Sequence, residues 1–234
     1  MHTRMHADRE AGDNRRPRSG TVVGVLLTIA ALTGAWSIWR FAWPILSTGD
    51  VGEHLGHFEL LYVHVIGGTA LLAVGAASLY IGSTKRAFRW HRTVGYMYLI
   101  AGGTGALLGV VLSLANTHSD PILPLALDLT AVSETGWALA TQGVAWLIAA
   151  SMALRAARNR RFDSHRGWMI RGYVIAWGFA LGSVLGGVPA IGELGDGAAI
   201  RWLTWVVPLL VCEAALQWRD TSVRARDVRV EVIS

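Results

Sequence analysis

The sequence predicts an all-α membrane protein, a bundle of six transmembrane helices with both termini in the cytoplasm. Hydrophobic residues make up 53% of the 234 residues, and the mean hydropathy is +0.40. Charged residues make up only 16%, whereas soluble domains carry roughly 25%. The charges are also segregated, so that long stretches have none. These stretches approach the ~20 residues that a helix needs to cross a bilayer.

Six apolar stretches are candidate spans, and arginine and lysine orient them. The loops after the second and fourth spans and the C-terminal tail are basic, whereas the loops on the other side are mainly acidic. By the positive-inside rule the basic segments are cytoplasmic, and an even number of spans then places both termini there. The candidate spans are Thr21–Trp43, Glu59–Gly82, Thr93–Ala115, Gly136–Leu154, Gly167–Pro189 and Leu203–Trp218.

The chain divides into a membrane domain and two polar tails. We expect residues 1–20 to form a polar cytoplasmic tail, residues 21–218 the six-helix domain, and residues 219–234 a basic cytoplasmic tail. The first apolar stretch is longer than the core of a signal peptide and lacks a small-residue cleavage site, so it is expected to remain as a helix. The expected location is the cell (plasma) membrane, with the lipid bilayer as the first partner.

Composition also excludes several classes of function. The formal net charge of +5 could suggest nucleic acid, but the arginines lie beside apolar spans, which indicates membrane orientation. The single cysteine, Cys212, rules out an internal disulfide and a multi-cysteine metal site. The sequence has no phosphate loop, no H-E-x-x-H helix and no G-x-S-x-G elbow.

One basic motif occurs twice. Residues 86–92 and residues 160–166 both read R-x-F-x-x-H-R, 74 positions apart, and each runs into an apolar stretch. The offset pairs the second and third spans with the fourth and fifth. Both copies have the same membrane orientation, so they predict a parallel two-helix internal repeat in the central four helices. The repeat places His91 and His165 at equivalent depths near the cytoplasmic face.

Two histidines on facing helices at one depth are the arrangement that ligates a b-type haem. We expect His91 and His165 to be the axial ligands of haem b, with Arg92, Arg166 and Arg171 placed to pair with the propionates. Simple anchoring at the interface, binding of a lipid phosphate, and another ligand or metal are the alternatives that the pattern leaves open.

Small residues recur at helical spacing along the spans that carry histidines. Such rows let helices approach closely in lipid, and they would also leave room for a flat macrocycle against the backbone. The rows include Gly68 and Gly75 after His64, and Gly95, Gly102 and Gly109 after His91.

Arg171 is a separate feature, because it lies about 7 Å deeper than Arg166 on the same helix. A charged residue inside a membrane span normally has a partner and a function. Glu213 on the last span lies at a comparable depth, so we expect an Arg171–Glu213 ion pair. Extension of the arginine toward the interface is the alternative.

Three stretches resemble a domain-of-unknown-function family of bacterial multi-pass membrane proteins. The stretches are residues 64–68 (HVIGG), 91–96 (HRTVGY) and 165–173 (HRGWMIRGY). The resemblance covers about half of the chain. It implies a protein of the bacterial inner membrane and transfers no established activity.

More remotely, the core is similar to the diheme transmembrane cytochromes that pass electrons from ascorbate across membranes. The similarity implies that His91 and His165 form one ligand pair and that His64 belongs to a second pair. The position expected for the fourth ligand holds Ala138, and His118 at the end of the neighbouring span is a weak substitute. The similarity therefore implies one haem near the cytoplasmic face more firmly than two.

The leading hypothesis is a b-type haem protein that transfers electrons to or from a redox partner. A lipid-like or quinone-like ligand is also compatible with the pattern. One alternative is a non-redox interaction or assembly protein, or a small transporter. A further alternative is a membrane-embedded enzyme that acts on a lipid-like substrate with the histidines as acid or base, so whether the chain is an enzyme stays open.

Overall fold

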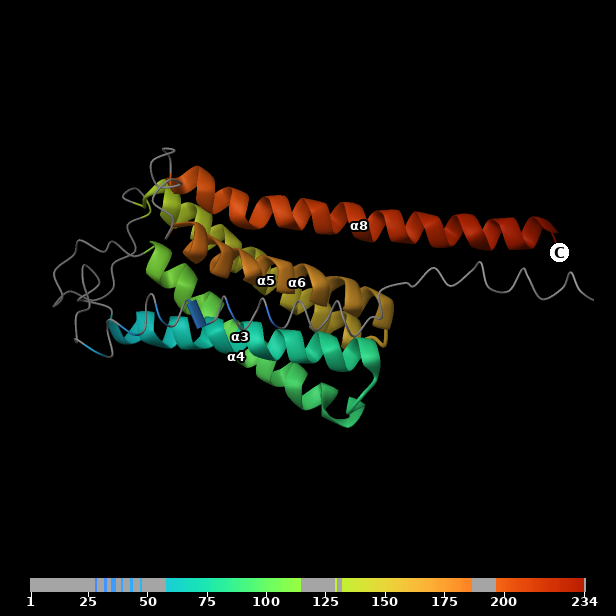
Figure 1. The fold of residues 1–234 in the computed structure, drawn as a ribbon, viewed down its shortest axis with the longest axis horizontal. Helices are drawn as coiled ribbons and strands as arrows, with labels where there is room; N and C mark the ends of the chain where they lie inside the picture. The colour runs from blue at the N-terminus through green and yellow to red at the C-terminus, as the bar shows by residue number, and fades with distance from the viewer. Residues whose placement is uncertain are drawn as a thin grey trace, which may run out of the picture.

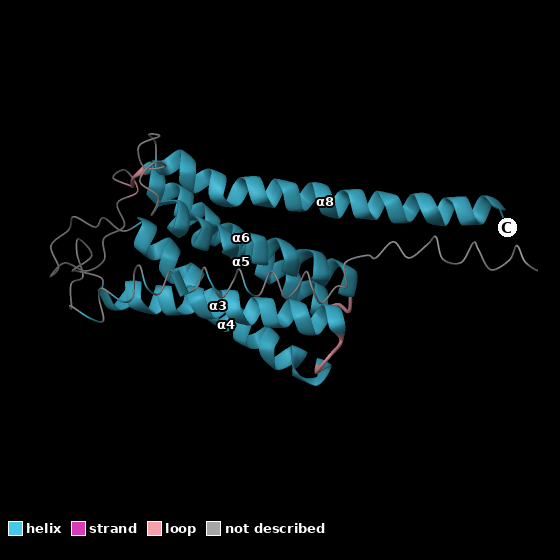
Figure 2. Ribbon diagram, viewed as in Figure 1, coloured by secondary structure: helices cyan, strands magenta, loops and turns pink. Residues whose placement is uncertain are grey.

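The computed structural model describes residues 58–114, 129, 132–186 and 197–233, together with seven positions between 28 and 47. The main elements in this part of the chain are all helices, and no strand occurs among the described residues (Figure 2). The all-α class is therefore confirmed. The helices are α3 (Phe58–Thr84), the 3-10 helix η4 (Phe88–Trp90), α4 (His91–Leu114), α5 (Glu134–Arg158), α6 (Phe162–Gly186) and α8 (Gly197–Ile233).

Four of the five α-helices in the described part are long and apolar enough to cross a membrane. They contain the segments Val63–Thr84, Phe88–Leu114, Glu134–Arg158 and Gly197–Trp218. The fifth, α6, covers most of the predicted span Gly167–Pro189 and carries three charged residues in its first half. The first predicted span, Thr21–Trp43, lies outside the described residues apart from single positions.

Several helix boundaries differ from the predicted spans, and two of them have a clear physical reason. Helix α5 begins at Glu134 because the hydroxyl of Ser133 accepts a hydrogen bond of 3.1 Å from the Gly136 N–H and caps the helix. Helix α8 continues to Ile233, fifteen residues beyond the predicted end at Trp218. Hydropathy marks where a helix leaves the apolar region, and it does not mark where the helix itself ends.

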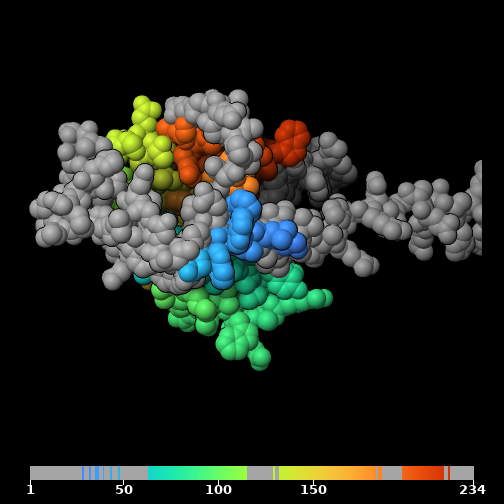
Figure 3. Space-filling view, turned by 60° about the vertical axis from the view of Figure 1, so that its left-hand side comes forward, coloured from blue at the N-terminus to red at the C-terminus, as the bar shows by residue number. Residues whose placement is uncertain are grey.

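The helices form two hairpins and one flanking helix. Helix α3 packs on α4, and α5 packs on α6, while contacts of α4 with α5 and of α3 with α6 join the hairpins. Helix α8 packs along α6 and α5, opposite α4 (Figure 3). The tips of both hairpins lie at the same end of the bundle, and α8 extends past the bundle at that end (Figure 1). We call it the tip end.

Glycine allows α3 and α4 to pack backbone against backbone. A Cβ added at Gly67 would lie 3.2 Å from the carbonyl oxygen of Ala101, and one added at Gly105 would lie 3.5 Å from the amide nitrogen of Gly68. Small residues at such positions are the usual means of close helix association in lipid. Gly67 and Gly105 are not members of the predicted rows, and the row members Gly68 and Gly95 have nothing in the described chain within 4 Å of an added Cβ.

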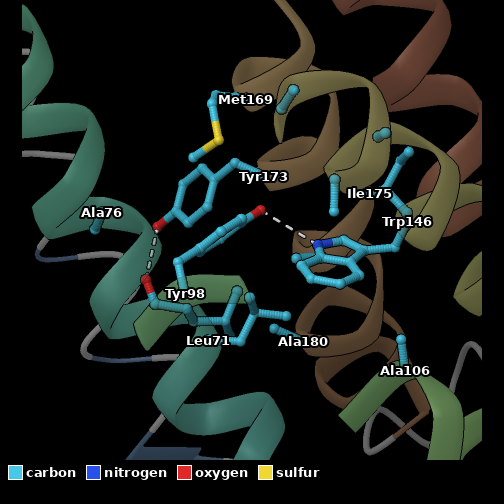
Figure 4. Close-up of a cluster of buried hydrophobic side chains, with 14 residues drawn as sticks. Leu71, Ala76, Tyr98, Ala106, Trp146, Met169, Tyr173, Ile175 and Ala180 are labelled. Carbon is cyan, nitrogen blue, oxygen red and sulfur yellow. Dashed lines mark hydrogen bonds between the residues drawn. The ribbon is translucent and has the colours of Figure 1, made fainter. Parts of the chain in front are cut away.

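Aromatic side chains fill the middle of the bundle. Tyr98 and Trp146 are each 1% exposed, and the Trp146 Nε1–H donates a hydrogen bond of 3.2 Å to the Tyr98 hydroxyl (Figure 4). Tyr173 donates a hydrogen bond of 3.2 Å to the carbonyl oxygen of Leu72 (Figure 4). A Cβ at Gly75 would lie 2.7 Å from the Tyr173 ring and 2.8 Å from the Tyr98 ring. At this depth the small residues make room for the protein's own rings.

Candidate functional site at the tip end

Two tight turns form the tip end. Lys85 after α3 and Arg160 after α5 adopt left-handed backbone conformations, with φ of 60° and 58°. The Lys85 N–H donates to the Ile81 carbonyl at 3.0 Å, and the Arg161 N–H donates to the Ala156 carbonyl at 2.9 Å. These are helix C-terminal motifs in which glycine is the usual left-handed residue. Each turn reverses the chain, so the next helix starts beside the helix that precedes it.

The two turns place His91 and His165 next to each other. His91 is the first residue of α4, and His165 lies three residues after the start of α6. The centres of the two imidazole rings are 6.3 Å apart, and the ring planes are nearly perpendicular, at 87°. The two rings therefore lie close together at the tip end, although α4 and α6 are not among the described helix pairs that pack closely.

The His165 ring is held by a backbone carbonyl. Its Nδ1 lies 2.9 Å from the carbonyl oxygen of Ala153, a residue that is 1% exposed on α5. A carbonyl only accepts hydrogen bonds, so Nδ1 carries the proton. In the neutral ring Nε2 then has a free lone pair. Metal-binding histidines are commonly oriented in this way by a partner on the other ring nitrogen.

The His91 ring lies in a different environment. It stacks on Phe88, with ring centres 5.2 Å apart and planes at 12°. On α3 it lies against Gly82, where an added Cβ would be 3.2 Å from His91 Cε1. Its Nδ1 is buried and has no hydrogen-bond partner within the described chain. A buried polar atom without a partner is unusual, because burial removes the water that would otherwise bind it.

The arginines next to the histidines are exposed. A guanidinium nitrogen of Arg92 lies 3.5 Å from the Tyr96 hydroxyl, and the group lies over the Tyr96 ring at 5.6 Å. Arg166 follows His165 and is exposed as well. Neither makes an ion pair with a described residue. Both are therefore free to bind an anionic group at the tip end.

Arg171 is bound to Glu213, which confirms the expected ion pair. Arg171 donates from Nε to Glu213 Oε2 at 2.7 Å and from a terminal nitrogen to Oε1 at 2.9 Å. Its guanidinium also lies 5.0 Å from the centre of the Trp168 ring. Six residues turn an α-helix through about 240°, so Arg171 lies on another face than His165. This geometry gives no support to a role of Arg171 as a propionate partner.

His64 belongs to a separate region, nearer the other end of α3. It precedes Gly82 by 18 residues, about 27 Å along a helix. Its Nδ1 lies 2.7 Å from the Gly105 carbonyl oxygen, and its ring meets Phe179 edge-on at 6.0 Å. Ala138, where a partner ligand is expected, is 1% exposed. His118 lies outside the described residues.

Some of these features cannot be read from the sequence. The stacking of Phe88 on His91 depends on the 3-10 turn at the start of α4, which carries no clear sequence signal.

Among the described residues, no three His, Cys, Asp or Glu side chains come together as a protein-only metal site would require. The histidine pair can therefore serve only a metal that takes its other ligands from elsewhere.

Comparisons with known proteins give a family and nothing more specific. Neither the search of curated proteins nor the search of solved structures gives a match. Residues 61–216, well over half of the chain, match the profile of DUF2306, whose description is "Predicted membrane protein". The match runs from near the start of α3 almost to the end of the apolar part of α8. The protein belongs to the DUF2306 family of predicted membrane proteins.

Proposed function

We propose that His91 and His165 are the axial ligands of one haem b at the tip end, and that the protein transfers single electrons in the bacterial inner membrane. The observation that carries the proposal is the 6.3 Å between the two ring centres. An iron–imidazole bond of about 2 Å, with the ring centre about 1 Å beyond each nitrogen, gives about 6 Å for two imidazoles on one iron. That bond length is the value for zinc sites, which are similar.

The chemistry of the two rings supports the same assignment. The carbonyl of Ala153 holds His165 with a free Nε2, and the buried Nδ1 of His91 has no hydrogen-bond partner among the described residues. The haem macrocycle supplies four nitrogen ligands, so two histidines would complete the coordination of its iron. Arg92 and Arg166 are the proposed partners of the propionates.

The packing restricts where a haem would bind. The middle of the bundle is filled by Tyr98, Trp146 and Tyr173, so we propose the tip end, beside the two histidines, as the place of the haem. There the large apolar side chains are exposed, with Phe88 at 51%, Trp90 at 52% and Phe162 at 68%. These side chains are the proposed apolar contacts of the group. When bound, haem supplies one-electron redox chemistry, and the protein supplies ligands and a dry environment.

We also propose six spans with both termini in the cytoplasm. Helix α6 packs against α3, α5 and α8, which are candidate spans themselves, so it is placed to cross the membrane with them. Both hairpin tips are basic and lie at one end, and the polar end of α8 extends in the same direction (Figure 1). The positive-inside rule assigns that end to the cytoplasm. The first span completes the count.

Absorbance of the purified full-length protein tests the haem. Protein from haem-replete cells is expected to show a Soret band, and His91→Ala and His165→Ala are expected to lose it. His64→Ala is the matched control and keeps the band, because His64 lies in the other region. His165→Met is expected to keep haem with an altered spectrum, since methionine is also an axial ligand. A wild-type protein without a Soret band would overturn the proposal.

A role in assembly with another membrane protein is the second candidate. Arg171 and Glu213 keep 23% and 38% of their side-chain surface exposed, although Glu213 lies in a candidate span. Charged groups at such depth normally face protein or water. If this candidate is correct, the purified protein carries no pigment, and Glu213→Gln together with Arg171→Gln abolishes co-purification of a partner.

A further inference from the structure

Helix α5 carries an open cavity of about 470 Å³ near its C-terminal end. The lining residues lie three or four positions apart, which places them on one face of the helix. All of them except Leu154 are polar and exposed, and two are arginines. The lining residues are Ser151, Leu154, Arg155, Arg158 and Asn159.

The polar groups of this cavity are available to a ligand. The side chains of Arg155, Arg158 and Asn159 form no ion pair or hydrogen bond with a described residue. The backbone carbonyl of Arg155 already accepts the Asn159 N–H at 3.0 Å, and the Ala156 carbonyl accepts a backbone N–H too. The end of α5 therefore needs no capping by these side chains. Their donors remain free to bind oxygen atoms of an anion.

An apolar row leads from the membrane to the cavity. Val144, Ile148 and Met152 follow one another at four-residue spacing on α5 and are 45%, 55% and 37% exposed. Helix α5 is a candidate span, so we expect this row to face lipid. From Val144 to Arg155 the helix rises about 16 Å, which is comparable to an acyl chain.

We propose that this cavity binds the phosphate of an anionic phospholipid, with one acyl chain along Val144, Ile148 and Met152. The guanidinium groups of Arg155 and Arg158 match phosphate oxygens in charge and geometry. Basic pockets at the cytoplasmic ends of transmembrane helices bind anionic lipid headgroups in this way. The site is independent of the haem assignment, because it uses the outer face of α5.

Lipid retention by the full-length protein in detergent tests the site. Native mass spectrometry would count phosphatidylglycerol and phosphatidylethanolamine bound after exchange into mixed micelles. The Arg155→Gln, Arg158→Gln double variant is expected to lose phosphatidylglycerol by about tenfold or more. The matched control is the Arg86→Gln, Arg89→Gln double variant, which removes two charges from the other hairpin tip and is expected to change retention by less than about twofold.

The remaining outcomes distinguish a specific lipid-binding site from general electrostatic attraction between arginines and anionic lipid. Equal losses in the two double variants, or no loss in either, would overturn the proposal. Displacement of the lipid by millimolar inorganic phosphate would also overturn it, because the acyl chain would then contribute nothing. Ile148→Ser is expected to weaken phosphatidylglycerol retention while leaving thermal unfolding unchanged. Arg155→Lys with Arg158→Lys is expected to recover part of the binding, since it keeps the charge but not the paired hydrogen bonds.

Discussion

A single added methyl group at Gly102 provides a sharp test of the packed aromatic centre. A Cβ at this position would lie 2.6 Å from Leu71 Cδ1 and closer still to ring atoms of Trp146. The next residue, Gly103, belongs to the same helix and has nothing within 4 Å of its added Cβ. Gly102→Ala and Gly103→Ala therefore make the same chemical change on the two faces of α4.

The size of the effect follows from what must move. Replacing glycine by alanine in a helix is worth up to about 1 kcal/mol in intrinsic preference, and this gain applies to both variants. Overpacking of a filled core costs about 1–3 kcal/mol. Trp146 is 1% exposed and is hydrogen-bonded to Tyr98, so its ring has little freedom to yield. We expect Gly102→Ala to be less stable than Gly103→Ala by about 2 kcal/mol.

Reversible unfolding of the purified protein by denaturing detergent measures this difference. Tryptophan fluorescence is a suitable signal, because Trp146 leaves the core on unfolding. The comparison between the two variants cancels effects of the detergent and of helix preference. Equal stability of Gly102→Ala and Gly103→Ala would refute the conclusion that the Trp146 ring packs directly against Gly102.

The remaining predictions concern buried polar contacts. Tyr98→Phe leaves the Trp146 Nε1–H buried without its acceptor, so we expect a loss of about 1–3 kcal/mol in the same unfolding assay. Tyr173→Phe removes a donor to the Leu72 carbonyl, but that carbonyl can still accept a hydrogen bond within its own helix. We therefore expect Tyr173→Phe to cost below about 1 kcal/mol of stability. A larger loss for Tyr173→Phe than for Tyr98→Phe would contradict these assignments. For Arg171 and Glu213, a double-mutant cycle with Arg171→Gln and Glu213→Gln should give a coupling of about 1 kcal/mol or more, and a value near zero would mean that the ion pair does not hold α6 to α8.

Hydropathy predicts most of this fold, because the bilayer imposes helices of a given length. The lysines and arginines predict that the loops after α3 and α5 lie on one side of the membrane. Hydropathy does not predict the two turns. Lys85 and Arg160 adopt left-handed conformations without the glycine that usually marks such a turn. Hydropathy likewise cannot say what fills the space beside a glycine. In the sequence, the rows of small residues after His64 and His91 are compatible with a macrocycle. In the structure, aromatic rings occupy the space beside Gly75 and Gly102.

The candidate site shows why a repeated motif does not give two equal environments. In the second copy α6 starts at Phe162, so His165 lies within the helix and reaches the Ala153 carbonyl. In the first copy a 3-10 turn occupies the matching positions and α4 starts only at His91. His91 therefore meets Phe88 and lacks a partner for Nδ1. The Ala153 carbonyl orients one imidazole and Phe88 stacks on the other, and this difference arises from the geometry of the two turns.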